Sequence, residues 1–166
     1  MRVLGIDPGI KTTGYGVVER GGSRHRLVAL GAIRTSPSLA HADRLAALHR
    51  DVVELVAEHD PEVMAIERLF FNSNVRTAMA VGQASGVALA AAARAGLEVF
   101  TYTPPEVKQS VAGVGNAPKA QVQAMVAAIL GLEEPPTPPD AADACALAIC
   151  HINRSGLARA LEAAGA

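Results

Sequence analysis

The chain has 166 residues, and half of them are hydrophobic, which suits one compact domain with a substantial core and leaves no room for a second domain. Fifteen basic and sixteen acidic residues give a formal net charge of −1, which excludes a strongly basic protein that holds nucleic acid through phosphate contacts alone. No uncharged apolar run reaches membrane-spanning length, and the chain opens on a predicted strand without signal-peptide architecture. We therefore expect a cytoplasmic protein with no membrane partner.

The first third of the chain is typical of an antiparallel meander. Residues 1–7 form an apolar run that stops at Asp7, where Pro8 and Gly9 enforce a turn. Residues 12–19 and 25–34 read as two further strands, joined in hairpin fashion by a short glycine-containing segment. Apolar residues then recur at 3.6-residue spacing between positions 45 and 56, which predicts a helix that packs one side onto the sheet.

The rest of the chain alternates strands and helices. A strand over 61–67 ends in Glu67, a long helix covers about 74–95, and a short strand covers 98–102. Helices begin at Pro104 and about Pro118, and a proline-rich stretch over 135–139 leads into a final alanine-rich helix. This order predicts an α/β fold, a mixed five-stranded sheet with helices on both faces. We assign residues 1–154 to a single domain and expect 155–166 to form a C-terminal tail with a tendency to fray.

The long helix contains Gly82 and Gly86, which would permit the close approach of another element. The sequence leaves open whether that element belongs to the same subunit or to a second one.

Four carboxylates, Asp7, Glu67, Asp140 and Asp143, close apolar strands or open the last helix. If they converge, each like-charged pair at about 4 Å costs roughly 4 kcal/mol at an effective dielectric near 20. The sum over all pairs would rival the roughly 5–15 kcal/mol that holds a domain folded. Cations or protonation must then relieve the repulsion. Singly, each acid is explained as well by a turn, a surface position or a helix cap, but together the four favour a metal site.

An all-oxygen ligand set favours hard cations such as Mg²⁺, with Mn²⁺ as a substitute, and it serves zinc poorly. Two such ions per subunit, roughly 4 Å apart, could activate a water and stabilise the leaving oxygen of an in-line phosphodiester displacement. The pattern of acids therefore predicts a metal-dependent phosphodiester hydrolase.

These residues, with Phe70 after Glu67 and with Lys108 and Lys119 around a Gly-x-Gly loop, resemble the RuvC-type Holliday junction resolvases over nearly the whole chain. The resemblance implies a ribonuclease H-like fold and a homodimer that makes paired, symmetric, Mg²⁺-dependent nicks in four-way junction DNA during homologous recombination and repair. It also implies 5′-phosphate and 3′-hydroxyl ends, and cooperation with the RuvA and RuvB branch-migration proteins.

By the same resemblance, Asp7, Glu67, Asp140 and Asp143 are the catalytic acids that bind the metal ions. Phe70 is similar to an aromatic residue that stacks on an unpaired base, a contact worth roughly 1–3 kcal/mol. Lys108 and Lys119 resemble lysines that contact the DNA backbone. The alternatives are a core position for Phe70 and a solvated surface position for either lysine.

Two other functions remain open on the sequence alone. The segment from Gly5 to Thr13 also resembles the phosphate loop of actin-like phosphotransferases and ATPases, although 166 residues supply only one of the two lobes that those enzymes close around a nucleotide. The second alternative is a non-catalytic module that binds branched nucleic acid without cutting it. Metal-dependent nicks in a synthetic junction would favour the nuclease over both.

Overall fold

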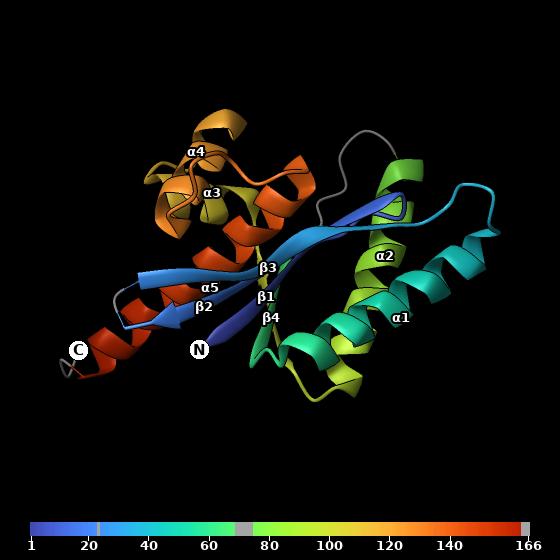
Figure 1. Ribbon diagram of the computed structural model, residues 1–166, viewed down its shortest axis with the longest axis horizontal. Helices are drawn as coiled ribbons and strands as arrows, with labels where there is room; N and C mark the ends of the chain where they lie inside the picture. Colours follow the sequence, from blue (N-terminus) through green and yellow to red (C-terminus); the bar gives the residue numbers. More distant parts are fainter. Residues whose placement is uncertain (23, 69–74, 164–166) are drawn as a thin grey trace.

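The computed structural model describes residues 1–22, 24–68 and 75–163, with backbone alone at 75–76 and 158–163. The described residues form a five-stranded sheet in the order β3-β2-β1-β4-β5 (Figure 1). Its strands are β1 (Arg2–Asp7), β2 (Thr12–Gly21), β3 (Arg24–Arg34), β4 (Val63–Glu67) and β5 (Glu98–Tyr102). The first three strands pair antiparallel, whereas β1, β4 and β5 run parallel. The predicted mixed sheet is therefore confirmed.

Helices cover both faces of this sheet, as the sequence predicted (Figure 1). The helices α1 (His41–His59) and α2 (Val75–Arg94) pack against each other on one face. The other face carries α3 (Pro104–Ala112), α4 (Lys119–Leu130) and α5 (Pro139–Ala163). Each helical layer has its own apolar core against the sheet, because β1 and β4 send alternate side chains to opposite faces. Both strands therefore read as continuous apolar runs.

The helix α5 lies unusually close to β1 and β2, and strand glycines make this possible. A Cβ atom at Gly5 would overlap the backbone carbonyl of Ala144, and one at Gly14 would overlap the backbone carbonyl of Asp140. At Gly16 a Cβ would collide with Cys145. Glycine within a strand often marks such a close approach of backbones. Because these positions lack side chains, α5 and its acidic first turn can pack directly on the backbone of the sheet.

The start of α3 is well defined. Thr103 caps α3 in a reciprocal capping box, in which its hydroxyl accepts from the backbone N–H of Glu106 and the Glu106 carboxylate accepts from the backbone N–H of Thr103.

The helix α5 continues without interruption across residue 154 to Ala163. The division into a 1–154 domain and a separate tail stays a prediction.

Within the described ranges, no helix is long and apolar enough to cross a membrane.

Both cysteines, Cys145 and Cys150, are buried in α5 as free thiols, and burial raises the pKa of Cys145 to about 12 and that of Cys150 to about 11. Neither thiol is therefore ionised near neutral pH.

Candidate active site

Asp7 and Glu67 close neighbouring parallel strands and face the same side of the sheet. In β1, Val3 belongs to the core under α5, whereas Leu4 and Ile6 belong to the core under α1 and α2. The two-residue period therefore turns Asp7 towards α5, and the matching register of β4 does the same for Glu67. The predicted strand-end positions of both acids are confirmed, and the fold adds that they share a face.

The first turn of α5 brings two more acids to this edge of the sheet. Asp140 lies in the first turn, directly above Gly14, and Gly14 is the residue paired with Asp7 across β1 and β2. Asp143 follows three residues later on the same helix face. All four acids that the sequence singled out therefore gather at one end of the sheet, between β1, β4 and α5.

Asp7 lies at the electrostatic centre of this cluster. Burial, together with the negative charges of Asp143, Glu67 and Asp140, raises the pKa of Asp7 from 3.8 to about 7. Burial and the charge of Asp143 raise the pKa of Glu67 as well, in the same direction and for the same reasons. Burial and the neighbouring negative charges therefore leave Asp7 partly protonated near neutral pH.

Lys119, the first residue of α4, supplies positive charge to the acidic cluster. Its Nζ atom lies 2.5 Å from Oδ2 of Asp143. The hydrogen bond to Asp143 raises the pKa of the Lys119 ammonium, and the charges of Asp143, Asp7 and Asp140 add to the effect. Lys119 in turn lowers the pKa of Asp7 and of Glu67 below what the acids alone would produce.

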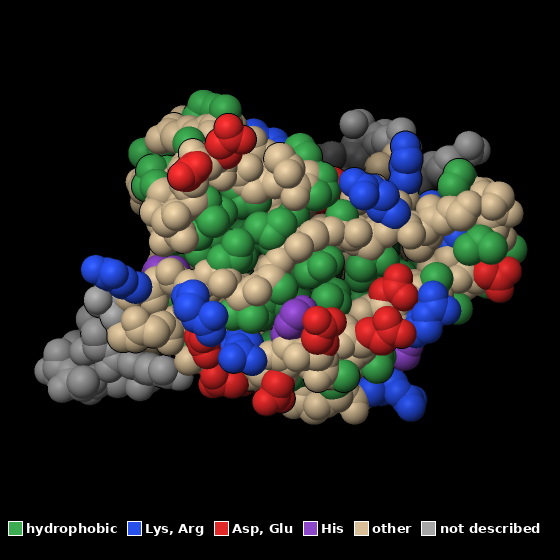
Figure 2. Space-filling model, in the orientation of Figure 1, with side chains coloured by type: hydrophobic (Ala, Val, Ile, Leu, Met, Phe, Trp, Pro, Cys, Tyr) green, Lys and Arg blue, Asp and Glu red, His purple; other side chains and the backbone are tan. Residues whose placement is uncertain are grey.

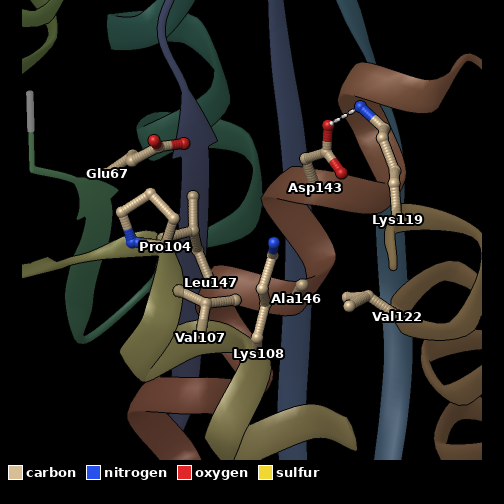
Figure 3. A pocket seen from close by; sticks show the side chains of 9 residues that line it. All are labelled: Glu67, Pro104, Val107, Lys108, Lys119, Val122, Asp143, Ala146 and Leu147. Carbon is tan, nitrogen blue, oxygen red and sulfur yellow. Dashed lines mark hydrogen bonds and ion pairs between the residues drawn. The ribbon is translucent and has the colours of Figure 1, made fainter. Parts of the chain in front are cut away.

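A cleft opens beside the acids, between α3, α4 and α5 (Figure 3). Glu67 and Asp143 lie on its rim, on either side of the β1 ribbon. Lys108 of α3 and Lys119 of α4 extend to the same rim from below and from the opposite wall. The structure thus brings Lys108 and Lys119 to the same cleft as Glu67 and Asp143, although the lysines are more than 20 residues from these acids in the sequence.

Three polar residues that the sequence analysis left aside shape the turn after Asp7. The buried Thr13 hydroxyl donates to the carbonyl of Gly9 at 2.6 Å and accepts from the N–H of Gly9 at 3.3 Å. Thr35 and Arg44 both donate to the carbonyl of Ile10, Arg44 at 3.2 Å. These bonds fix the backbone that leaves Asp7, but nothing in the sequence pattern distinguished these residues from ordinary surface polar groups.

Phe70, the predicted base-stacking residue, falls in the segment 69–74 and lies outside the described residues. Its neighbour Arg68 is exposed and donates to Oγ1 of Thr101 at 3.3 Å.

The oxygen donors of the four acids suit a hard divalent cation, but the side chains are not oriented to hold one. Their donor atoms are all carboxylate oxygens, and the charges of three neighbouring acids add to burial in raising the pKa of Asp7. Among the described residues, however, no three acidic, histidine or cysteine side chains form a group that could hold a metal ion as they are oriented. Asp143 in particular is turned to Lys119.

Charged side chains on one face of the molecule do not form an extended basic surface. On the face shown in Figure 2, lysine and arginine side chains are interspersed with aspartate and glutamate. Among the described residues several charged side chains are paired, for example Arg2 with Glu19 at 3.3 Å. The mixed pattern agrees with a net charge of −1 and favours local recognition at the cleft.

Comparison with known proteins places the chain in a family. The family model described as crossover junction endodeoxyribonuclease RuvC matches residues 3–151. A crossover junction endodeoxyribonuclease RuvC from Pelotomaculum thermopropionicum is 53% identical over 162 residues, which cover 98% of this chain and 99% of the relative. One from Salinispora arenicola is 54% identical over 165 residues, which cover 99% of this chain and 94% of the relative.

Solved structures agree with this assignment. RuvC of Thermus thermophilus in complex with Holliday junction substrate is 41% identical and superposes with a TM-score of 0.91, covering 95% of this chain and 96% of that one. The yeast mitochondrial Holliday junction resolvase, at 16% identity and a TM-score of 0.66, shares the fold alone.

The sheet order, the helical layers and the acids at one sheet edge define a ribonuclease H-like domain. The chain belongs to the crossover junction endodeoxyribonuclease RuvC family. The resemblance stated from the sequence is therefore confirmed.

Proposed function

We propose that the protein is a Holliday junction resolvase, an endonuclease that makes paired, symmetric nicks in four-way DNA junctions during homologous recombination and DNA repair. The observation that carries this proposal is the gathering of Glu67, Asp140 and Asp143 around Asp7 at one end of a ribonuclease H-like sheet, where burial first and then these three charges raise the pKa of Asp7 to about 7. Membership of the family supports the choice of DNA substrate. It also disfavours an actin-like phosphotransferase and a module that binds junctions without cutting them.

We infer that Asp7, Glu67, Asp140 and Asp143 are the catalytic residues and bind two Mg²⁺ ions per subunit, for which Mn²⁺ can substitute. When bound, such ions supply activation of the attacking water and neutralisation of the leaving 3′ oxygen, which leaves 5′-phosphate and 3′-hydroxyl ends. Asp7 and Glu67 are suited to the central ligand positions because they project from rigid strand ends. Asp143 becomes available when Lys119 releases it, and Asp140 is placed by the first turn of α5.

The two lysines act on the phosphate in this proposal. Lys108 and Lys119 border the cleft from two helices, so a phosphodiester held at the acids would lie within the field of both ammonium groups. They would orient the phosphate and stabilise the charge that develops on its oxygens. Phe70 would hold the junction by stacking on an unpaired base beside the cleaved bond.

A homodimer suits this substrate, because a four-way junction has approximate twofold symmetry and two identical sites can nick opposing strands. The exposed side of α2 is the proposed interface. A Cβ atom at Gly86 would meet none of the described residues within 4 Å, so Gly86 serves no close contact with that part of the subunit. Met79, about two turns earlier on the same side of the helix, is 58% exposed. The family resemblance further suggests that RuvA and RuvB deliver the junction to this dimer.

The proposal is tested on a synthetic four-way junction with mobile centre, incubated with Mg²⁺, with Mn²⁺ and with a chelator. The expected result is symmetric, metal-dependent nicks whose products can be religated, since ligation requires 5′-phosphate and 3′-hydroxyl ends. Asp7→Asn should abolish the nicks while junction binding stays intact or strengthens, because a repulsive carboxylate near phosphate is removed. Binding without nicks by the unaltered protein would favour the non-catalytic module.

The lysines and the aromatic residue need separate variants. Lys108→Ala should slow cleavage at all salt concentrations, and unchanged rates would assign Lys108 to the solvated surface. Phe70→Ala should bind the junction and cleave it poorly, whereas loss of the folded state would assign Phe70 to the core. Exposed Arg50 of α1, 65% accessible at its side chain, offers Arg50→Ala as a charge-matched control for Lys108→Ala.

A further inference from the structure

The cleft beside the acids has an apolar floor that the proposed metal and phosphate chemistry does not use. Its volume is about 220 Å³, and it is lined below the charged rim by Pro104, Val107, Val122, Ala146 and Leu147 (Figure 3). Val107 and Val122 are 9% and 7% exposed, so their methyl groups are almost withdrawn from water but still reach the cavity wall. An apolar cavity of about 150 Å³ already accommodates a six-membered ring. The cleft therefore has room for one ring-sized group.

Covalent connectivity decides which part of a DNA strand lies closest to this floor. The floor begins directly below the rim formed by Glu67, Lys108, Lys119 and Asp143. A phosphate held at that rim carries two ester oxygens, and each of them is bonded to a deoxyribose carbon. A base lies farther away, beyond the sugar. A deoxyribose flanking the cleaved bond is thus the group that reaches the floor first.

The floor offers a hydroxyl group no partner. All five of its side chains are hydrocarbon or proline, and they belong to the helices α3, α4 and α5, whose backbone groups bond within each helix. Pro104 begins α3 and has no N–H to donate. The C2′ carbon of deoxyribose would lose only water there, whereas the 2′-hydroxyl of ribose would lose its hydrogen bonds to water without replacement.

We propose that this apolar floor seats the deoxyribose next to the cleaved phosphodiester and selects DNA over RNA at that one nucleotide, because it desolvates a 2′-hydroxyl without giving it a hydrogen-bond partner. This inference rests on the proposed nuclease function. It adds a specificity determinant made of Val107, Val122 and Leu147 to a site otherwise described by its charges.

The test uses junctions that carry a single ribonucleotide on the 5′ side or the 3′ side of the cleaved phosphate. Under single-turnover conditions, we expect one of the two substitutions to slow cleavage by about 10- to 100-fold, the range in which an apolar pocket rejects an added hydroxyl. A 2′-fluoro nucleotide at the same position keeps the ribose-like sugar pucker but lacks the O–H donor. It should be cleaved within about threefold of the all-DNA rate on this account.

Cleavage at the all-DNA rate with a ribonucleotide at both positions overturns the inference. Equal slowing by ribose and 2′-fluoro also overturns it, because sugar pucker would then explain the effect. Junction binding, measured separately in chelator, shows whether the sugar is already selected before the chemical step. No cleavage of the all-DNA junction would instead refute the proposed function, so the two failures are distinguishable.

A protein variant tests the floor directly. Val122→Thr replaces one methyl by a hydroxyl of similar size that can pair with the 2′-hydroxyl, so the ratio of DNA to ribose cleavage rates should fall. Val53→Thr, at a position 40% exposed on α1, is the matched control and should leave the ratio unchanged. Should Val122→Thr fail to fold, Val107→Thr replaces it. An unchanged ratio in a folded variant argues against this floor as the selector.

Discussion

The Nζ atom of Lys119 and the Oδ2 atom of Asp143 form a 2.5 Å hydrogen-bonded ion pair that joins the start of α4 to the first turns of α5. The pair partly neutralises the acidic cluster, yet it also engages a carboxylate that a metal ion would need. If Asp143 binds a metal ion as proposed, Lys119 and the divalent cation compete for it. The side chains are 60% and 28% exposed, so solvent screens the pair and its strength is modest.

Replacing Lys119 by methionine should strengthen metal binding in the absence of DNA. Removing a competitor worth up to about 1 kcal/mol predicts an increase of up to roughly fivefold in affinity for Mn²⁺, measured by titration calorimetry. Cleavage of junctions should slow, because the phosphate loses one of its two lysines. Arg50→Met, which removes an equal charge from α1, is the control. Unchanged or weaker metal affinity in Lys119→Met would contradict the competition.

The raised pKa of Asp7 predicts a stability that depends on pH in the metal-free protein. The unfolded chain releases this proton near pH 3.8, whereas the folded protein holds it to about pH 7. Between these values the folded state binds more protons, so the free energy of unfolding falls as the pH rises. The loss is complete above about pH 7 and is on the order of 4 kcal/mol.

Asp7→Asn removes this titration and should be more stable than the parent at pH 8 but nearly equal to it at pH 4. Urea unfolding at the two pH values in the presence of a chelator measures the difference. The same gain in stability at both pH values would mean that repulsion at Asp7 is not the cause.

Metal uptake should release a proton in a pH-dependent manner. Near pH 6 the Asp7 carboxyl is largely protonated, because its pKa is about 7, and a cation can bind it only by displacing that proton. Calorimetric titration in buffers of different ionisation enthalpy should therefore report close to one proton released at about pH 6 and almost none at about pH 8.5. Asp7→Asn should show no such release. Release that persists at the higher pH would point to another group.

Gly14→Ala should disturb the cluster of acids although Gly14 itself has no side chain that could take part in the reaction. The added Cβ would collide with the backbone of Asp140, so α5 and its acids must shift away from Asp7. We expect a loss of about 1–3 kcal/mol in unfolding free energy. Displacing reacting groups by about 1 Å can cost roughly 100-fold in rate, so cleavage should fall further than stability implies. Gly21→Ala is the control, because a Cβ there meets nothing within 4 Å. Similar effects at both glycines would exclude the close approach as the cause.

Much of this architecture is readable from local signals. Apolar runs that stop at Asp7 and Glu67, together with the glycine and proline turns, predicted where the strands lie along the chain. The 3.6-residue spacing predicted α1, and the proline-rich stretch before Asp140 predicted the start of the last helix. These signals work because secondary structure depends on neighbours within a few residues.

The sequence by itself therefore determined the class of fold, and it singled out the four acids and predicted a need for positive charge among them. Only the tertiary structure decided that Asp7 and Glu67 face α5, since strands that are apolar on both sides hide their two-residue period. It also decided that strand glycines admit α5, that Lys119 pairs with Asp143 across 24 residues, and that an apolar floor lies below the charges. Such relationships arise from packing between distant segments, which no local pattern encodes.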